Sequence, residues 1–384
     1  MTSHIDLLTS DPNISAALHV RQARGTERLN QPFSVMLEIE YEDDAGLDAA
    51  WVKQLLTEPV GIRLHLADGP LEIHGQLRWL EMSGVTLGEK TTYGALLGPK
   101  VLSLEDTRRS RIFQDMDLPT LIRAVMSEAV LPGGGSLQED VHYSLAGVTG
   151  TYPEVGDQIV QYEESDWAFL NRWLEHWGVH YHFRYEAVPG EAIMMFGDTN
   201  RAFPSYQIDP QGTPSDPKFD PSAGSINREG IWELRQRLQP QPASVVLRDY
   251  NWRKPEVGLQ SQVPADVETG GGFRYFYGEH FKDPEEGQRI ATLRAERLIC
   301  ERESVVGRAS LPRLAPGASF VLRDHPLPDF TDLELRAVAC VWTTALRTQS
   351  HPNYPLTQVH NRIELVRASL PWRPAHDQTP RPRV

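Results

Sequence analysis

The sequence predicts a mainly β protein with inserted helices, an α+β fold in which two related antiparallel β-barrels are joined by a helix-containing connector. Strand-like alternation of apolar and polar residues fills both ends of the chain, helix signals gather in its middle, and the early strand motifs recur in the same order near the end. The 384 residues exceed what one hydrophobic core usually serves. We therefore expect several domains in one chain.

The first barrel is expected over residues 1–105. Its clearest strand, FSVMLEIEYE at 33–42, alternates apolar residues on one face with mainly polar residues on the other. Three further segments continue this pattern, at 60–69, 71–82 and 91–101. Such alternation is typical of antiparallel strands with one face in water, so a sheet or barrel is predicted here.

The connector is expected over residues 106–240 and contains two helices. The first begins at about Leu118, with a proline in its first turn. The second is predicted over 166–177, because Ser165 is a favourable N-cap and Gly178 suits a helix end.

One face of the second helix is strongly apolar. At roughly 100° per residue, five large side chains share a stripe of about 120°, which predicts a core-facing surface. These residues are Trp167, Leu170, Trp173, Leu174 and Trp177. Phe169 projects from the opposite side with His176, and we name these two as candidates for a contact with another subunit. Burial under the chain's own connecting segments is the alternative for Phe169.

The strand after this helix carries a pair of histidines. VHYHFRYE at 179–186 places His180, His182 and Arg184 on one face and apolar residues on the other, which predicts a half-exposed strand. Two histidines on one strand face can bind zinc, but such a site needs a third ligand. His180 and His182 are therefore weak metal candidates, and we favour a solvated or interfacial pair.

The second barrel is expected over residues 241–368, with one long helix before its last strands. Asp283 is the predicted N-cap of that helix, and Glu286 completes a capping box. Strand patterns occur at 244–252, 318–325, 333–346 and 358–366. The run FVLRDH, LELRAVACVW, HNRIELV has the order of IRLHLADG, LEIHGQLRWL, YGALL in the first barrel, which suggests a repeat. Residues 369–384 are rich in proline and predict a semi-rigid linker.

Composition and charge limit the classes of partner. A net charge of −14 with 38 basic residues argues against nucleic acid or an anionic membrane as the main partner. No N-terminal run resembles a signal peptide, and no segment approaches the ~20 apolar residues of a membrane span, so we expect synthesis and folding in the cytosol. Cys300 and Cys340 have apolar neighbours and no CxxC motif, which predicts buried, reduced thiols.

The sequence offers little catalytic chemistry. It contains no G-x-S-x-G, H-E-x-x-H, P-loop or G-x-G-x-x-G motif, and it predicts no cofactor. The acidic cluster of Glu163, Glu164 and Asp166 could serve a glycosidase, and the histidine pair a metal-dependent hydrolase. Acidic residues before a helix are also the favourable partners of its positive end, so we expect this structural role and no enzyme activity.

Three stretches together resemble a known family. They are RRSRIFQDMDLPTLIRAVM at 108–126, IVQYEESDWAFLNRWLEHWGVHYHF at 159–183 and HNRIELVRASLPWRPAHDQTPRPRV at 360–384. They are similar to the N-terminal hub region of VgrG, the spike protein of type VI secretion systems, whose fold is similar to that of the central baseplate hub of contractile phage tails. The resemblance covers nearly the whole chain in order. His180 and His182 depart from the plain aromatic residues usual at this place in the family.

The resemblance implies a phage tail hub-like fold and a structural hub of a contractile injection machine. Family members are homotrimers, so two barrels per chain give six positions that match a hexameric, Hcp-like tube protein. It also implies contacts with baseplate proteins, and a spike-tip PAAR protein and effectors carried through an OB-fold and needle that follow the linker. The chain would be cytoplasmic before firing and injected into a target cell afterwards. The hub of a contractile phage tail or phage-like particle is the alternative.

Overall fold

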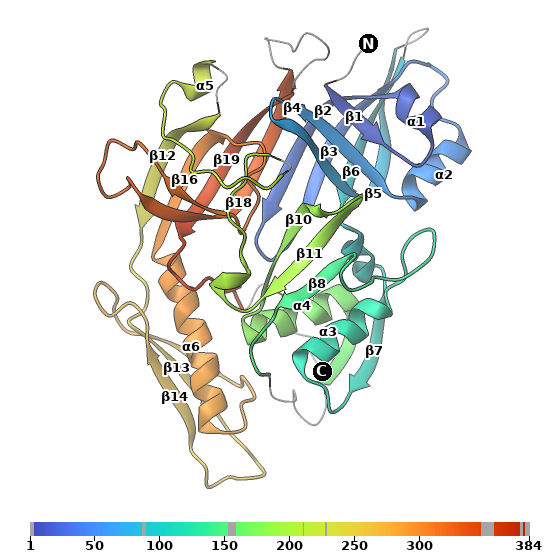
Figure 1. Ribbon diagram of the computed structural model, residues 1–384. Coiled ribbons are helices and arrows are strands. Elements are labelled where there is room, and N and C mark those ends of the chain that lie inside the picture. The colour runs from blue at the N-terminus through green and yellow to red at the C-terminus, as the bar shows by residue number, and fades with distance from the viewer. Residues whose placement is uncertain are drawn as a thin grey trace.

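The structure is a computed structural model and describes residues 4–86, 90–152, 159–209, 211–226, 229–346, 357–376 and 379–380. Over these residues the protein is mainly β with few helices, as the sequence predicts. Figure 1 shows a broad sheet in the upper part of the view, a mixed region with α3 (Leu118–Ser127) and α4 (Asp166–Trp177) below it, and a smaller unit around α6 (Pro284–Glu301) that projects from the body.

Eleven of the described strands form one large sheet. Six come from the N-terminal part: β1 (Ile5–Leu8), β2 (Leu18–Arg28), β3 (Gln31–Tyr41), β4 (Val60–Leu66), β5 (Gly69–Thr86) and β6 (Lys90–Gly98). Five come from the C-terminal part: β12 (Gly230–Leu238), β16 (Glu303–Ser310), β17 (Ser319–Leu322), β18 (Leu333–Leu346) and β19 (Thr357–Arg367). The N-terminal part also contains α1 (Pro12–Ala17), α2 (Ala49–Thr57) and the 3-10 helix η1 (Lys100–Glu105).

The two halves of the large sheet have the same strand order. The N-terminal order is β4-β5-β6-β3-β2, and the C-terminal order is β17-β18-β19-β16-β12. The pairing also corresponds, because Leu64 lies opposite Leu71 in the first half and Leu322 lies opposite Leu333 in the second. The repeat that the sequence suggests is therefore present in the topology.

The predicted pair of closed barrels is not what the sheet forms. Residues 24–28 of β2 pair antiparallel with residues 339–343 of β18. To close into a barrel, the N-terminal half would need this edge of β2 for one of its own strands. Because β18 occupies the edge, the two halves share one open sheet. Among the described strands its order begins at β1 and ends at β12, and these two strands do not pair with each other.

Two smaller sheets lie between the halves. One has the order β10-β11-β8, from β8 (Tyr143–Gly147), β10 (His180–Val188) and β11 (Glu191–Gly197). The other pairs β7 (Arg108–Phe113) with β9 (Ile159–Ser165). The short helices η2 (Asn200–Ala202) and α5 (Ala223–Ile226) follow.

The predicted helix over 166–177 is confirmed with both of its caps. The Ser165 hydroxyl accepts a hydrogen bond from the backbone N–H of Ala168 at 3.1 Å, and Gly178 ends the helix with a left-handed φ of 66°. Of the predicted core stripe, Trp167 and Trp177 are buried and Trp173 is half-buried. The main core joins this helix to both halves of the large sheet.

A separate small unit follows β12. β13 (Ser244–Asp249), β14 (Leu259–Pro264) and β15 (Phe273–Tyr277) form a sheet in the order β14-β13-β15, which packs on α6. Its own core consists of Val245, Leu247, Leu259, Phe281, Ile290, Ala291, Ala295 and Leu298. The strand predicted at 244–252 therefore does not join the second half-sheet, whereas β12, on the connector side of residue 240, does. Alternation shows that a strand has one buried face and does not show which core covers it.

The segment after β19 folds back onto the body. Trp372 is buried and donates its backbone N–H to Asn200 Oδ1 at 3.3 Å, and Arg373 donates to the carbonyl oxygen of Gly178 at 3.2 Å. The described part of the predicted linker at 369–384 is thus attached to the connector, while 377–378 and 381–384 lie outside the described residues. No described helix combines the length and apolar composition that crossing a membrane requires.

Candidate interaction surfaces

The acidic cluster before α4 is used in structural ion pairs. Asp166 is 0% exposed, and its carboxylate accepts hydrogen bonds from Arg109 (2.6 and 3.0 Å), Arg111 (3.2 Å) and Gln161 (2.8 Å). Both arginines also pair with Glu128. The cluster joins the stretches RRSRIF and QYEESD, so the most specific part of the family resemblance holds β7, β9 and α4 together.

The two glutamates of the cluster do not form a catalytic pair with Asp166. The guanidinium group of Arg172 donates to both carboxylate oxygens of Glu164 at 2.7 to 3.1 Å. Glu163 is exposed near the end of β9. Glu164 is thus neutralised by an arginine, Asp166 is buried between two arginines, and Glu163 is in solvent. No two of these carboxylates face each other across a gap that could hold a substrate.

The prediction of a solvated or interfacial histidine pair is wrong. His180 and His182 are 0% and 1% exposed, because their face of β10 packs against other parts of the same chain. The His180 ring stacks on Phe203 with 3.9 Å between ring centroids. Burial lowers the pKa of both imidazoles, that of His182 to about 3, so both rings are neutral at physiological pH. Within the described part of the chain, no group of three or more His, Cys, Asp or Glu side chains could hold a metal ion.

Phe169 is not available to another subunit. Its side chain is 0% exposed and stacks on Phe113 of β7, with ring centroids 5.5 Å apart and planes at 14°. The connecting segment thus covers the second face of α4, which is the alternative to the favoured interface. His176 keeps 15% of its side chain exposed and lies 3.7 Å from the Glu279 carboxylate. A subunit contact at His176 stays a prediction.

The two cysteines are buried and free, as predicted. Burial raises the pKa of the Cys300 thiol to about 11, and it raises that of Cys340 further. We therefore expect both thiols to react slowly with thiol reagents in the folded chain.

A buried carboxyl lies where the two half-sheets and β10 meet. Glu27 on β2 accepts hydrogen bonds from the Tyr185 hydroxyl on β10 and the Trp342 Nε1–H on β18, both at 2.6 Å. Burial raises the pKa of Glu27 from 4.5 to about 7, against the lowering effect of these two bonds. Protonation of this carboxyl therefore stabilises the joint between the halves.

We expect Glu27→Gln to remove a pH dependence of stability. The unfolded carboxyl titrates near 4.5 and the folded one near 7, so its stabilising effect is complete below pH 4.5 and is lost as the pH rises to about 7. The difference between these two pKa values corresponds to about 3 kcal/mol of folding free energy. Guanidinium unfolding of both proteins at pH 5 and pH 8 checks this. The natural chain should lose about 2 to 3 kcal/mol more than the variant, and an equal loss contradicts the assignment.

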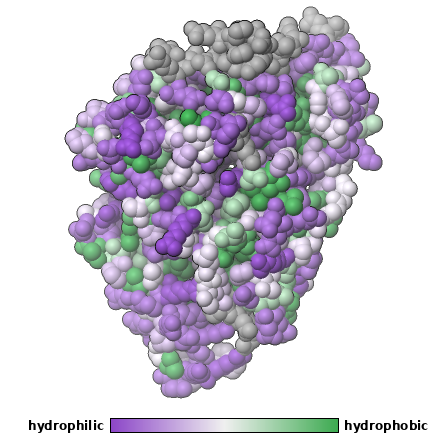
Figure 2. All heavy atoms as spheres, viewed as in Figure 1, coloured by the Kyte–Doolittle hydropathy of each residue, from purple (hydrophilic) through white to green (hydrophobic). Residues whose placement is uncertain are grey.

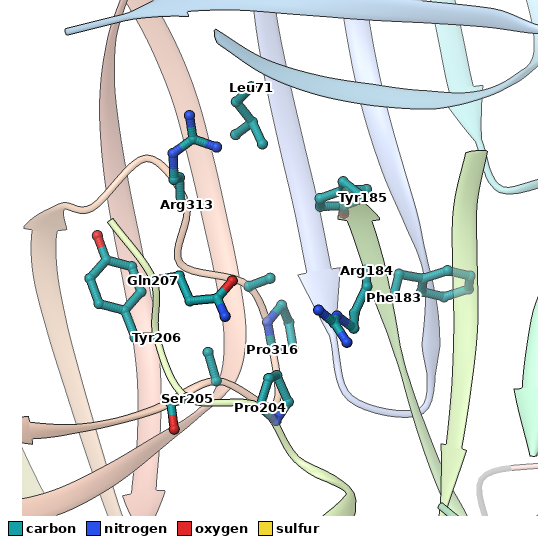
Figure 3. A pocket seen from close by; sticks show the side chains of 12 residues that line it. Leu71, Phe183, Arg184, Tyr185, Pro204, Ser205, Tyr206, Gln207, Arg313 and Pro316 are labelled. Carbon is teal, nitrogen blue, oxygen red and sulfur yellow. The ribbon is translucent and has the colours of Figure 1, made fainter. Parts of the chain in front are cut away.

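One cavity lies between β10 and two loops of the body. Figure 3 shows its lining, which includes Phe183, Tyr185, Tyr206 and Arg313. Its volume of about 90 Å³ is well below the 300 Å³ or more of common ligand pockets. The guanidinium group of Arg313 is held by Asp68 at 3.1 Å, so this charge is already compensated. We interpret this cavity as a packing gap between the halves.

The outer face of the small sheet is aromatic. Phe273, Tyr275 and Tyr277 alternate along β15 with exposed fractions of 62%, 49% and 63%. Tyr275 lies opposite Val246 of β13, on the face turned away from the core under α6. Figure 2 shows that the viewed side of the molecule is mainly hydrophilic, with hydrophobic residues in small separate areas.

Basic side chains accompany these aromatic residues. Trp252 is 73% exposed, and the Arg253 guanidinium lies 5.0 Å from its ring centroid. Exposed basic residues nearby in the sequence are Arg248, Arg253 and Lys254, and Arg248 lies opposite Tyr277. Aromatic residues and arginine are enriched where proteins bind one another, so this is a candidate docking surface for a partner protein. Sequence reasoning missed it, because alternation along β15 does not reveal which face is covered.

Comparison with known proteins gives a consistent result. A family model described as phage tail baseplate hub (GPD) matches residues 26–343. A Pseudomonas aeruginosa protein, type VI secretion system spike protein VgrG5, is 30% identical over 334 residues, which cover 84% of this chain and 38% of that protein. VgrG1c of the same organism is 28% identical, over 81% of this chain and 40% of that protein. The chain thus spans about two fifths of the length of these relatives.

Solved structures show the same fold. An Escherichia coli component of the type VI secretion system, described as similar to the T4 bacteriophage tail proteins gp27 and gp5, has a TM-score of 0.64 at 17% identity. The match covers 95% of this chain and 80% of that one. A 43 kDa tail protein of prophage MuSo2 from Shewanella oneidensis has a TM-score of 0.55 at 12% identity, over 93% and 99% of the two chains.

Proposed function

The chain belongs to the phage tail baseplate hub family, and on this premise we propose that it is the structural hub at the base of the spike in a type VI secretion machine. The observation that carries the proposal is the repeated strand order within one chain, β4-β5-β6-β3-β2 and β17-β18-β19-β16-β12. A chain with two similar halves presents two similar binding positions. The curated relatives named above are spike proteins of this machine.

We propose that three chains form a ring that matches a hexameric tube. Each half-sheet is the counterpart of one barrel, so a homotrimer offers six related positions to an Hcp-like tube protein. Baseplate proteins would surround the ring, and the aromatic surface on β15 is a suitable contact for one of them. A PAAR protein, effectors and the needle belong to the complete assembly, for which this chain supplies the base. The chain would act in the cytoplasm before firing and reach the target cell with the spike.

An enzymatic role is not part of this proposal. Asp166 and Glu164 are held by arginines, and His180 and His182 are buried and neutral. These are the residues that a glycosidase or a metal-dependent hydrolase would need free. A relative from Vibrio cholerae is an actin cross-linking toxin, and the match covers 27% of it. We do not propose that activity for this chain.

The hub of a contractile phage tail or phage-like particle is the second candidate. The prophage tail protein from Shewanella oneidensis favours it, because the match covers 99% of that chain. The two candidates share one architecture and differ in the machine. Genes for a type VI membrane complex beside this gene support the first candidate, whereas capsid genes support the second.

We expect the purified chain to be a homotrimer. Native mass spectrometry should give three times 43.3 kDa, about 130 kDa. Electron microscopy with added Hcp-like tube protein should then show the trimer at tube ends. A stable monomer that leaves tube ends bare contradicts the hub function.

A further inference from the structure

The small sheet beside α6 contains a strand with an open edge. The strand order is β14-β13-β15, and among the described strands β15 pairs only with β13. The Gly278 N–H, directly after β15, donates to the carbonyl oxygen of Arg248 on β13 at 3.3 Å. Because the backbone groups of successive strand residues point to opposite sides, those of Tyr277 and Tyr275 point away from β13. β15 can therefore pair with one more strand.

The aromatic row of β15 lies beside this open edge. Phe273, Tyr275 and Tyr277 are exposed on the outer face, whereas Val245 and Leu247 of β13 belong to the core under α6. Figure 1 places the small unit at the lower end of the molecule, away from the large sheet. An added strand would bring its own side chains within about 5.5 Å of the aromatic row and cover part of it.

A loop with a further aromatic and a basic residue adjoins the end of β15. Asn251 of this loop donates its side-chain N–H to the carbonyl oxygen of Lys282 at 3.3 Å. This hydrogen bond ties the loop after β13 to the chain that follows β15. Trp252 and Arg253 thus extend the aromatic surface on β15 at its C-terminal end.

The exposed charge of this part of the chain is basic, although the whole chain has 52 acidic and 38 basic residues. Between residues 244 and 282, the exposed acidic side chains are Glu256 and Glu268, and Glu268 lies 3.4 Å from Arg302. The same span has five exposed basic side chains, which are Arg248, Arg253, Lys254, Arg274 and Lys282. An excess of positive charge beside aromatic residues suits an acidic partner, and it repels a second copy of the same surface.

An acidic polypeptide fits these features better than a nucleic acid does. The open backbone groups of β15 are the donors and acceptors that an extended peptide needs to join a sheet. The net charge of −14 on the chain repels a polyanion such as DNA.

We propose that an extended acidic segment of another protein adds to β15 as a fourth strand of the small sheet. Its backbone pairs with the open N–H and C=O groups of Tyr275 and Tyr277, and its apolar side chains cover the aromatic row. Its carboxylates pair with the basic residues around Arg253. The inference rests on the proposed hub function for the place of this partner in the machine, and it adds the chemistry of the partner.

Two labelled peptides test the acidic partner. One alternates glutamate with valine, and the other has the same length with lysine in place of every glutamate. Fluorescence anisotropy with the full chain should show that the acidic peptide binds at least about tenfold more tightly and that salt weakens its binding. Equal binding of the two peptides, or binding of neither, overturns the proposal. Tighter binding of an oligothymidylate of equal charge overturns it in favour of a nucleic acid.

Two pairs of variants locate the site. Arg253→Glu with Lys254→Glu should weaken binding of the acidic peptide about tenfold. Arg24→Glu with Lys53→Glu, on exposed residues of β2 and α2, is the matched control and should leave binding unchanged. Tyr275→Pro should abolish the binding that Tyr275→Thr only weakens, because proline removes the N–H at the open edge, where an edge strand tolerates it. Equal effects of the two double charge reversals overturn the proposal, whether or not the proline variant folds.

Native mass decides the hub function separately. A trimer that fails the peptide tests overturns the acidic strand and leaves the hub function standing. A monomer that binds the acidic peptide at β15 overturns the hub function and leaves the binding site standing. A dimer of trimers that Tyr275→Thr dissociates overturns the acidic partner, because it assigns the surface to a second copy of this chain.

Discussion

Asp166→Asn is expected to lower the free energy of unfolding by about 3 to 5 kcal/mol, because it removes the anion between two arginines at a fully buried site. The amide nitrogen of the variant would face a guanidinium donor, so the hydrogen bonds are lost together with the charge. Guanidinium unfolding followed by tryptophan fluorescence measures the change.

Glu163→Gln is the matched control for this prediction. It makes the same carboxylate-to-amide change three residues earlier, on a side chain in solvent, and should stay within about 0.5 kcal/mol of the natural chain. A double-mutant cycle of Asp166→Asn with Arg109→Gln should show coupling of about 1 to 3 kcal/mol. Equal, small effects of Asp166→Asn and Glu163→Gln would mean that the cluster does not hold the connector together.

Local signals in the sequence were sufficient for individual elements. α4 follows from the Ser165 cap and the Gly178 end, and α6 begins with Asp283 accepting from the Glu286 N–H at 2.9 Å. β18 occupies 333–346 as predicted. These features depend on residues a few positions apart, which is why one sequence contains enough information for them.

Long-range arrangement was less accessible. The alternation in β10 correctly predicts a strand, yet both of its faces are buried over residues 180–183, because the His180 ring stacks on Phe203 and the His182 ring lies against the same phenylalanine. The prediction that each half closes into a barrel is wrong for a similar reason. Which strand β2 pairs with depends on β18, more than 300 residues later in the chain, and no local pattern encodes that choice.

The candidate surfaces could be predicted only in part. The repeat between 60–98 and 319–367 is visible in the sequence and is confirmed by the strand order of the two halves. The aromatic surface on β15 was not predicted, since its exposure depends on α6 covering the other face of the small sheet. For Phe169 the helical projection leaves two alternatives, an interface and burial under the chain's own segments, because it shows the apolar stripes of the helix but not what covers them.

Phe169→Ala is expected to lower the free energy of unfolding by about 3 to 5 kcal/mol, since it empties a fully buried position. The ring lies between Phe113, at 5.5 Å, and the guanidinium of Arg172, at 5.0 Å, so its loss also removes a stacked pair and a cation–π contact. Chemical unfolding measures the change, and native mass of the folded fraction measures assembly.

The comparison of Phe169→Asp with Ile112→Ala separates core from interface. Ile112 lies on the same connector with 58% exposure, so its change to alanine should stay within about 0.5 kcal/mol of the natural chain. A carboxylate at 169 has no solvent and no free cation, because Arg172 is already paired with Glu164 at 2.7 Å. We therefore expect Phe169→Asp to unfold the chain rather than to yield folded monomers. Folded monomers of normal stability would return Phe169 to the subunit interface, and they would require the stack on Phe113 to be dispensable.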